Sequence, residues 1–543
     1  MSRVINRLPP LPPPRTWYTH FPSKYLPASP DRNMIRKSIG RKLLANPKMC
    51  DDFVKSLNLR EGEVVIDAYS GVGSLTRSLL TGGNYLEESK SWTPALVEEV
   101  LTEDKDQDEV KKSISKSKVK KQKYPLWLED LPPSLSTTTN AATSPTSSAE
   151  VEKKEPIKPK LVVSSEGSLE LLVRSFNYPP KPSNPLSTIG REISQDPYTR
   201  PVPVITTPLH PNLLLSHSTA YVWPTLPKLL ENPLVQASLP VHNPELPPGD
   251  IEAYKRKWED PEPPITIVCQ MPDSSIGEQL ASQWVGSAVG DPGQKRTWIW
   301  EWGRIRLALL CGKSLYDRIL APPGSVIHCK LSILAQALFD IVPLPPYHHV
   351  LNVDKQSRFS HDRPFKSLSE VPPSTVPPNG IPVNPPSSID TFIRPEHGQR
   401  TLTYPLDFYP PVTAAQRLIG KPLERPDLLG LMLIPKLHSP ILSSQKDTWD
   451  YCMRRLFVRD TLTLTKAIPN LSFGAETLLA HIEDQSTDRY RGVPVDGRRV
   501  IRDLRVEEWL RIVDVFDNWA FKPDNLILDS GSPDETSREV GQD

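Results

Sequence analysis

Short apolar runs and helically spaced apolar residues alternate along most of this 543-residue chain. The runs "EVVIDA", "KLVVSS", "ITIVCQMP" and "LLGLMLIP" are rich in Val, Ile and Leu, which is typical of strands buried on both faces. Segments such as "SLELLVRSF" and "KLSILAQALFD" have the spacing of amphipathic helices. Strands that alternate with helices predict an α/β sheet covered by helices on both faces.

Helical spacing also predicts elements outside this alternation. Residues 34–59 read as helical turns before the first strand, and residues 277–289 read as a further helix. Beyond residue 447 the pattern is mostly helical. We therefore expect a sheet-bearing domain at residues 26–440, a small helical domain at 445–529 and a polar tail at 530–543.

Three stretches lack apolar patterning and are predicted to be inserts, at residues 87–158, 177–211 and 356–399. The first joins the charged run "EDKDQDEVKKSISKSKVKKQK" to a tract of Ser, Thr, Pro and Ala, and the other two are rich in proline. Proline makes up 62 of the 543 residues. Because such segments bury too little apolar surface to offset the entropy cost of ordering, we expect largely disordered loops there.

The first 25 residues form a basic, proline-rich leader. Positions 1–48 contain ten Arg or Lys residues and a single acid. Such a start is typical of a mitochondrial targeting segment, but "RLPPLPPPR" cannot form an uninterrupted amphipathic helix because proline breaks it. A targeting segment and a solvated proline-rich tail are therefore both open.

Composition and cysteine spacing exclude several classes of protein. The formal net charge of +1 gives no warrant by itself for a nucleic-acid partner. The five cysteines are widely spaced and form no C-x-x-C pair, so neither a disulfide framework nor a metal site is predicted. The chain has no apolar run of about 18 residues, so we expect no membrane span.

The turn after the first strand is the first candidate ligand site. In "IDAYSGVGSLT", Gly71 and Gly73 lie where the strand becomes a helix, and the missing Cβ atoms let the backbone approach a ligand. Asp67 ends this strand, in reach of a ligand amine or hydroxyl. Glu166 ends the next strand, where an acid suits the two hydroxyls of a ribose. The alternatives are a tight turn that binds nothing and a solvated loop glutamate.

The order of eight segments is informative beyond their individual patterns. The segments are "SIGRKLL", "VVIDAYSGVGSLT", "VVSSEGSLELL", "LLLSHSTAYVW", "ITIVCQMP", "KLSILAQALFDI", "PDLLGLMLIP" and "CMRRLFVRDTLTLTKAI". Over residues 23–528, without the inserts, this order resembles the rRNA adenine N(6)-dimethyltransferase family and specifically its fungal mitochondrial transcription factor B branch. The resemblance implies a class I S-adenosylmethionine-dependent methyltransferase fold, which is Rossmann-like, with a small C-terminal helical domain. The cofactor would lie at the switch point of the sheet, and a nucleic acid across the cleft between the domains.

The same resemblance assigns cofactor roles by position. The implied cofactor-binding residues are Gly40, Asp67, Gly71, Gly73, Glu166 and Thr219. Thr219 stands where the enzymes have an acid for the cofactor adenine, and Arg41 stands where a glutamine follows the early glycine. The resemblance therefore implies that S-adenosylmethionine binding is weak or lost.

The reacting loop departs from the family most clearly. The enzymes have Asn-Leu-Pro-Tyr or Asn-Leu-Pro-Phe, whereas this chain has Gln270-Met271-Pro272-Asp273. Gln270 moves the amide outward by one methylene, and a displacement of about 1 Å at the chemistry can cost on the order of a hundredfold in rate. Asp273 removes a stacking ring worth roughly 1–3 kcal/mol per base. We therefore expect Gln270 and Pro272 to belong to a degenerate, inactive catalytic loop.

Two segments combine cations with aromatic residues, as nucleic-acid surfaces do. "KRTWIWEWGRIR" contains Lys295 and Arg296 beside three tryptophans, and "MRRLFVRD" supplies Arg454, Arg455 and Arg459. Cations suit phosphates and rings suit unstacked bases. The alternative for the first segment is a half-buried strand whose tryptophans belong to the core, and for the second a solvated helical face.

The resemblance and the degenerate loop together favour a mitochondrial transcription initiation factor. We expect a monomer in the mitochondrial matrix that binds a mitochondrial RNA polymerase and the melted promoter strand. The main alternative is an S-adenosylmethionine-dependent rRNA adenine N(6)-dimethyltransferase that acts on small-subunit rRNA. A general RNA-binding scaffold is a further alternative.

Overall fold

The computed structural model describes residues 8–9, 11–12, 14, 17–21, 42–89, 156–178, 202–247, 249–290, 295–347, 401–409, 423, 426–486 and 489–526. Gly40, the insert expected at 356–399 and the polar tail at 530–543 lie outside the described residues. Most of the inserts expected at 87–158 and 177–211 also lie outside them.

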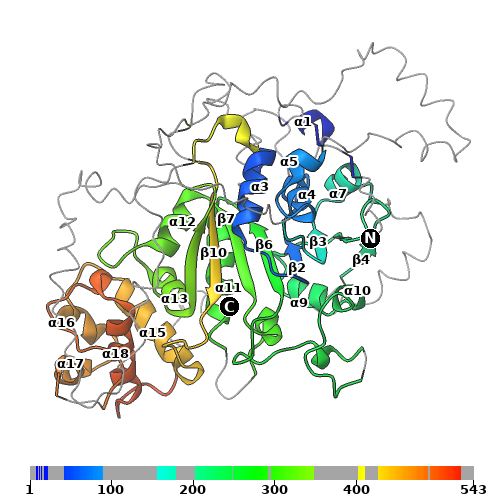
Figure 1. Ribbon diagram of the computed structural model, residues 1–543. Coiled ribbons are helices and arrows are strands. Elements are labelled where there is room, and N and C mark those ends of the chain that lie inside the picture. Colours follow the sequence, from blue (N-terminus) through cyan, green and yellow to red (C-terminus); the bar gives the residue numbers. More distant parts are fainter. Residues whose placement is uncertain are drawn as a thin grey trace, which may run out of the picture.

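An eight-stranded sheet lies at the centre of the molecule, in the order β4-β5-β3-β2-β6-β7-β10-β8 (Figure 1). From one edge to the other, the strands are β4 (Val204–Thr206), β5 (Leu213–Ser216), β3 (Leu161–Ser165), β2 (Val64–Asp67), β6 (Ile265–Gln270), β7 (Arg306–Cys311), β10 (Leu429–Pro435) and β8 (Phe339–Leu344). The strands from β5 to β7 are parallel, whereas β4 and β10 run antiparallel to their neighbours. A second, two-stranded sheet pairs β1 (Leu43–Leu44) with β9 (Phe408–Tyr409).

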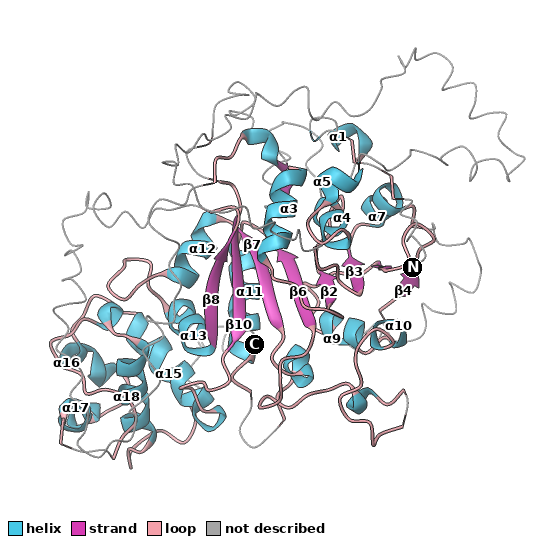
Figure 2. Ribbon diagram, viewed as in Figure 1, coloured by secondary structure: helices cyan, strands magenta, loops and turns pink. Residues whose placement is uncertain are grey.

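Helices cover both faces of this sheet, and Figure 2 shows them on either side of the strands. Neighbouring residues of a strand point to opposite faces, so Val64 packs in one core cluster and Val65 in the other. The helices are α1 (Trp17–His20), α3 (Pro47–Ser56), α4 (Ser74–Leu80), α5 (Tyr85–Glu88), α7 (Leu169–Phe176), α9 (Thr225–Leu230), α10 (Pro233–Gln236), α11 (Ser275–Ser287), α12 (Lys313–Leu320), α13 (Lys330–Leu338), α15 (Lys446–Phe457), α16 (Leu464–Ala467), α17 (Leu479–Glu483) and α18 (Val506–Asp517). Within the described ranges, no helix has both the length and the hydropathy of a membrane span.

This architecture confirms the predicted α/β class with a small helical domain. The four apolar runs of the sequence form β2, β3, β6 and β10. They read as continuous runs because helices cover both faces of the sheet at these strands. The helix expected at 277–289 is α11, which begins and ends two residues earlier.

Three local expectations were wrong. Residues 34–59 are not helical throughout, since Leu43–Leu44 pair as a strand and α3 begins only at Pro47. The insert expected at 177–211 includes β4, which is ordered because it adds an antiparallel edge to β5. The segment Trp298–Trp302 is a 3₁₀ helix and not a strand, and its tryptophans are all buried instead of alternating.

The described part of the leader packs on the sheet domain instead of extending into solvent. Leu8, Leu11, Trp17 and Phe21 are at most 4% exposed. Leu8 belongs to the core cluster around α3 and α4, while the other three pack with β1 and with the turn after β2. A solvated tail is therefore the wrong description for these residues, because their apolar side chains complete the core.

Polar groups of the domain hold the leader backbone as well. The buried guanidinium of Arg77 donates from Nε and Nη2 to the carbonyl of Pro9, at 3.2 and 3.0 Å. The backbone N–H of Leu11 donates to the hydroxyl of Tyr85 at 3.4 Å. Burial lowers the pKa of Arg77 to about 10, so this guanidinium stays charged at neutral pH. The leader thus supplies one of the acceptors that a buried cation requires.

The helical domain, from α15 to α18, shares a core with one face of the sheet. Trp449 and Trp509 belong to the same apolar cluster as α13 and β10. His328, in the loop between α12 and α13, adds a polar link because its Nδ1–H donates to the carbonyl of Arg502 at 2.8 Å. Its other nitrogen, Nε2, is buried without a hydrogen-bond partner among the described residues.

This link predicts a pH dependence of stability. Burial lowers the pKa of His328 to about 4, although the Arg502 carbonyl favours protonation. The unfolded chain therefore binds a proton that the folded chain does not, and stability falls as pH drops from about 6.5 to about 4, by roughly 3 kcal/mol for this group. Urea unfolding across this range should show a smaller loss for His328→Gln than for the wild type. If the free energy of unfolding falls by the same amount with decreasing pH in both proteins, the expectation is wrong.

Candidate functional site

The carboxyl ends of the parallel strands bring four predicted positions to one edge of the sheet. Asp67 ends β2, Gln270 ends β6, Glu166 follows β3, and Thr219 follows β5. The strands that follow β2 in the chain, β3 to β5, lie on one side of it, and the later strands, from β6 on, lie on the other side. The topological switch point of the sheet is therefore between β2 and β6, at this edge. Ligands of open α/β sheets bind at such a point.

The turn after β2 requires its two glycines for backbone and packing reasons. Gly71 and Gly73 have φ angles of +59° and +76°, which side-chain-bearing residues rarely adopt. A Cβ on Gly71 would lie 2.7 Å from Leu43 Cδ1, and one on Gly73 would lie 2.2 Å from Phe176 Cζ. Packing of the chain's own side chains against this turn therefore accounts for both glycines.

The two carboxylates at this edge bind groups of the chain itself. Glu166 is 1% exposed and accepts the N–H of Gly71 on Oε2 at 2.8 Å and the N–H of Ser168 on Oε1 at 2.9 Å. Asp67 is fully buried and accepts the hydroxyl of Thr76 on Oδ2 at 2.7 Å. Glu166 is thus no solvated loop residue, and each of its oxygens accepts one backbone N–H group.

The amide of Gln270 forms hydrogen bonds with two backbone segments. The N–H of Leu44 donates to Oε1 at 2.9 Å, and Nε2 donates to the carbonyl of Tyr69 at 3.3 Å. The carbonyl of Leu44 accepts the hydroxyl of Ser74 at 2.6 Å, so both backbone groups of this residue are fixed. Gln270 is 1% exposed. The amide that would receive a substrate amino group therefore holds β1 over the glycine turn.

The rest of the reacting loop is fixed by close backbone contacts. A Cβ on Gly277 would lie 2.0 Å from the carbonyl oxygen of Pro272, so α11 begins directly against the loop. The carboxylate of Asp273 lies against Gly312, where a Cβ would be 2.1 Å from Oδ1. Pro272 is buried, whereas Asp273 is exposed and has no ring to stack on a base.

Two aromatic rings lie together at the same edge. Tyr69 follows β2 and is 2% exposed, and its ring centroid is 4.5 Å from that of Tyr221, which follows β5. Thr219 accepts the N–H of Tyr221 on its hydroxyl at 3.4 Å. A Cβ on Gly167 would be only 3.2 Å from Thr219 Cβ, so the turns after β3 and β5 are in contact.

S-adenosylmethionine does not fit the edge as these residues lie. Leu43 covers Gly71, where the methionine moiety would have to approach the turn. Thr219 has no carboxylate for the adenine amine. Leu43 against Gly71 and the uncharged Thr219 are thus the two features of this edge that suit the cofactor poorly.

The structure does not bring Lys295 and Arg296 to this edge. They precede β7, so they lie toward its amino end, opposite the carboxyl edge. The Lys295 side chain is 93% exposed, with Nζ 3.5 Å from Glu252 Oε2. The guanidinium of Arg296 stacks on Trp258 at 3.7 Å from the ring centroid, and burial lowers its pKa to about 10. Arg296 therefore packs on the core instead of facing a phosphate.

The tryptophans of the same segment belong to the core. Trp298, Trp300 and Trp302 are at most 5% exposed and pack in the cluster with α11 and β7. Arg306, which ends the segment, binds both oxygens of the buried Glu63, at 2.6 and 2.7 Å. The core alternative thus describes this segment, since neither its rings nor Arg306 is available to a nucleic acid.

Arg454, Arg455 and Arg459 lie on α15 and the turn that follows it. This helix belongs to the helical domain, which lies beside β8 (Figure 2). In the sheet, β8 is four strand spacings from β2, or about 19 Å. Arg454 Nε lies 2.6 Å from Asp450 Oδ2, and the Arg455 guanidinium lies 5.4 Å from the centroid of the Tyr451 ring. Arg454 and Arg459 are exposed and Arg455 is partly buried, so all three reach the surface.

Sequence reasoning missed Tyr69 and Leu44. Tyr69 stands inside the quoted glycine turn, so its bulk beside two glycines was a visible sign that a ring lies at the ligand edge. No local pattern indicated that Leu44 would bond to a residue 226 positions away.

The described residues offer no metal-binding group of three or more His, Cys, Asp or Glu side chains. The five cysteines are free, and burial raises the pKa of the Cys50, Cys311 and Cys452 thiols. These three are therefore protonated at neutral pH and are poor nucleophiles and metal ligands.

Sequence and structure comparisons relate the chain to known proteins. It is 23% identical to mitochondrial transcription factor 1 of Lachancea kluyveri over 254 residues, which cover 46% of this chain and 55% of that protein. It is 30% identical to mitochondrial dimethyladenosine transferase 1 of Bos taurus over 106 residues, which cover 20% of this chain and 28% of that protein. The chain thus spans about half or less of each curated relative.

Solved structures match at TM-scores too low to support a comparison of folds. A dimethyladenosine transferase from Plasmodium falciparum gives a TM-score of 0.36, and the 23S rRNA methyltransferase ErmE gives 0.35. Each is 11% identical and covers 88% of this chain, with 97% and 99% of the respective structures aligned. The ribosomal RNA adenine dimethylase family matches residues 32–90 and 206–518. Since these residues make up more than half of the sequence, the chain belongs to the ribosomal RNA adenine dimethylase family.

Proposed function

We propose that the chain is a mitochondrial transcription initiation factor that binds a mitochondrial RNA polymerase and the melted promoter strand, and that it transfers no methyl group. The observation that carries the proposal is that the Gln270 amide forms hydrogen bonds with Leu44 and Tyr69 instead of facing a substrate base. The relative named mitochondrial transcription factor 1 supports the same reading.

The proposal includes a location and a set of contacts. The two curated relatives are named as mitochondrial proteins, and we place this chain in the matrix, where a mitochondrial polymerase works. We propose that it acts as a monomer and that Arg454, Arg455 and Arg459 contact phosphates of the strand. Lys295 is exposed enough for a further phosphate contact, whereas the packing of Arg296 on Trp258 argues against one.

An rRNA adenine N(6)-dimethyltransferase is the second candidate, because four positions of the cofactor set are retained. Asp67, Gly71, Gly73 and Glu166 lie together at the carboxyl edge, and the bovine relative is named as a dimethyladenosine transferase. The dimethyltransferase is the weaker candidate because Leu43 lies against Gly71 and because Thr219 stands where the enzymes have an acid.

Promoter-dependent initiation tests the proposal. Full-length chain and the cognate mitochondrial polymerase should be assayed on a linear duplex promoter and on the same promoter with a pre-melted start region. We expect the chain to raise transcription from the duplex by about tenfold or more, since each base-pair step that it opens costs about 1.4 kcal/mol of stacking.

The pre-melted template is the matched control, on which the chain should matter much less. If the chain changes transcription from neither template, the proposal is wrong and the rRNA enzyme becomes the better candidate.

A further inference from the structure

The helical domain exposes apolar side chains that a folded domain normally covers. Among the described residues, the large apolar side chains with the greatest exposed fractions are Phe473 at 101%, Val458 at 80% and Phe521 at 75%. All three belong to this domain. Leaving one phenylalanine in water forgoes about 1.5–3 kcal/mol of burial, so a group of such residues marks an interaction surface.

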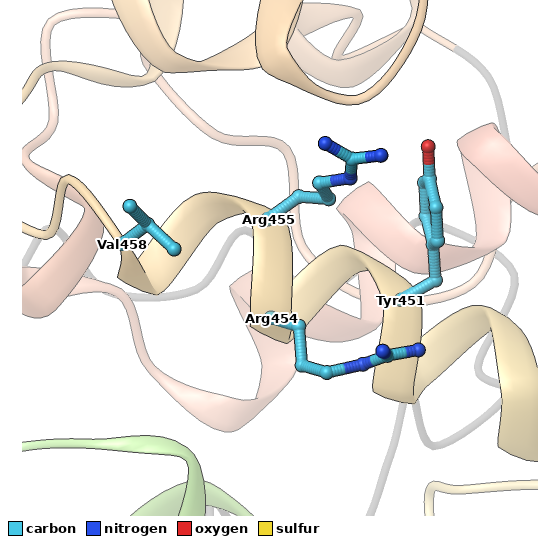
Figure 3. A pocket seen from close by; sticks show the side chains of 4 residues that line it. All are labelled: Tyr451, Arg454, Arg455 and Val458. Atoms are coloured by element: carbon cyan, nitrogen blue, oxygen red, sulfur yellow. The ribbon is translucent and has the colours of Figure 1, made fainter. Parts of the chain in front are cut away.

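A pocket on α15 lies next to one of these residues. Its volume is about 210 Å³, and Tyr451, Arg454, Arg455 and Val458 line it (Figure 3). They follow one another at spacings of three, four and seven positions from Tyr451, along α15 and its C-cap residue Val458. The Tyr451 hydroxyl donates to the carbonyl of Leu471 at 2.5 Å, which fixes the ring beneath the Arg455 guanidinium.

Ring contacts connect this pocket with Phe521, and the backbone beside Phe473 lies near the same group of rings. The Tyr451 ring stacks on Phe516 at 5.6 Å, and Phe516 contacts Trp519 at 6.0 Å. Trp519 in turn contacts Phe521 at 5.7 Å. Gly474, the neighbour of Phe473, approaches Trp519, with its Cβ position 3.9 Å from Cζ2. We call Tyr451, Arg454, Arg455, Val458, Phe473 and Phe521 the ring–arginine surface.

The chemistry of this surface suits unpaired nucleotides. Exposed rings stack on bases of any sequence, and guanidiniums bind phosphates while their planes can also stack. Arg454 is held by Asp450 and by the carbonyl of Leu526, at 2.6 and 3.4 Å, so its side chain is already oriented at the pocket. A guanidinium has five N–H donors, so these contacts do not exhaust its capacity for a phosphate.

We propose that the ring–arginine surface is a stacking site for an unpaired strand, in which Phe473 and Phe521 stack on bases while Arg454 and Arg455 bind the adjoining phosphates. The inference rests on the proposed function and deepens it, because it names the residues that would hold the melted strand and places them away from the closed carboxyl edge.

The test compares Phe473→Ala, Phe473→Leu and Phe473→Tyr in the full-length chain, with a single-stranded oligonucleotide that carries 2-aminopurine. Leucine keeps the apolar area without the ring, and tyrosine keeps the ring. We expect Ala and Leu to weaken binding by about tenfold with loss of 2-aminopurine quenching, and Tyr to bind like the wild type. Phe521→Ala should weaken binding similarly, whereas Val241→Ala, at another exposed apolar position, should not.

Salt dependence separates stacking from charge. The phenylalanine variants should keep the wild-type salt slope, whereas a variant with Arg454→Gln and Arg455→Gln should lower it by about 1.4, at about 0.7 for each phosphate contact. Unchanged strand binding by Phe473→Ala and Phe521→Ala overturns the stacking site.

The initiation assay keeps the two proposals distinguishable. If the wild type drives initiation but the phenylalanine variants bind the strand normally, the function stands and this site is wrong. If the variants lose polymerase binding and keep strand binding, the surface docks a protein, which also overturns the proposal. If the wild type neither binds a single strand nor drives initiation, the proposed function itself is wrong.

Discussion

Replacing Trp17 by alanine is expected to lower the free energy of unfolding by about 3–5 kcal/mol, which is the usual cost of removing a large buried aromatic side chain. Trp17 is fully buried in a cluster with β1 and the glycine turn, and its ring lies 5.3 Å from that of Tyr409. Its Nε1–H donates to the carbonyl of Pro12 at 2.7 Å, so the side chain also fixes the path of the leader.

Equilibrium unfolding in urea measures this effect, with His20→Ala as the matched control. His20 ends the same helix but is exposed, so its replacement should change stability little. An unchanged unfolding midpoint for Trp17→Ala would show that the leader packs only loosely in solution.

The same packing limits proteolytic processing of the leader. A cut after Phe21 would remove apolar core residues and the Pro9 carbonyl that accepts from Arg77. We therefore expect mass spectrometry of the protein recovered from mitochondria to find Leu8 to Phe21 still present. A mature form that begins after Phe21 and unfolds at the same urea concentration as the full chain would contradict this.

The second large expected effect is the absence of cofactor binding. S-adenosylmethionine should bind the purified chain with a dissociation constant weaker than about 1 mM, or about −4 kcal/mol. The reason is steric and electrostatic, because Leu43 lies against Gly71 and Thr219 has no charge for the adenine amine. Isothermal calorimetry measures this constant directly.

Methyl transfer from labelled S-adenosylmethionine to small-subunit rRNA should likewise be undetectable. The variant with Gln270→Asn and Asp273→Tyr restores the loop sequence of the enzymes and is still expected to be inactive, since the cofactor edge stays closed. An active dimethyladenosine transferase serves as the positive control. A dissociation constant near 1 μM, or about −8 kcal/mol, would instead favour the enzyme.

The sequence by itself determined the architecture. Its continuous apolar runs and helical spacings are local patterns, and burial on both faces of a sheet selects them residue by residue. For this reason β2, β3, β6 and β10 were predictable, and so was the helical domain. Asp67, Gln270, Glu166 and Thr219 also meet at one edge as expected, because carboxyl ends of parallel strands always do.

Only the tertiary structure decided what those side chains bind. Gln270 bonds to Leu44 and Tyr69, and Glu166 bonds to Gly71, across separations of 226, 201 and 95 residues that no local pattern encodes. The composition of the proline-rich leader left a targeting segment and a solvated tail both open, yet Trp17 is buried because the domain offers it an apolar surface. A polar or aromatic residue suits several environments equally well, so its role depends on which neighbours the fold brings to it.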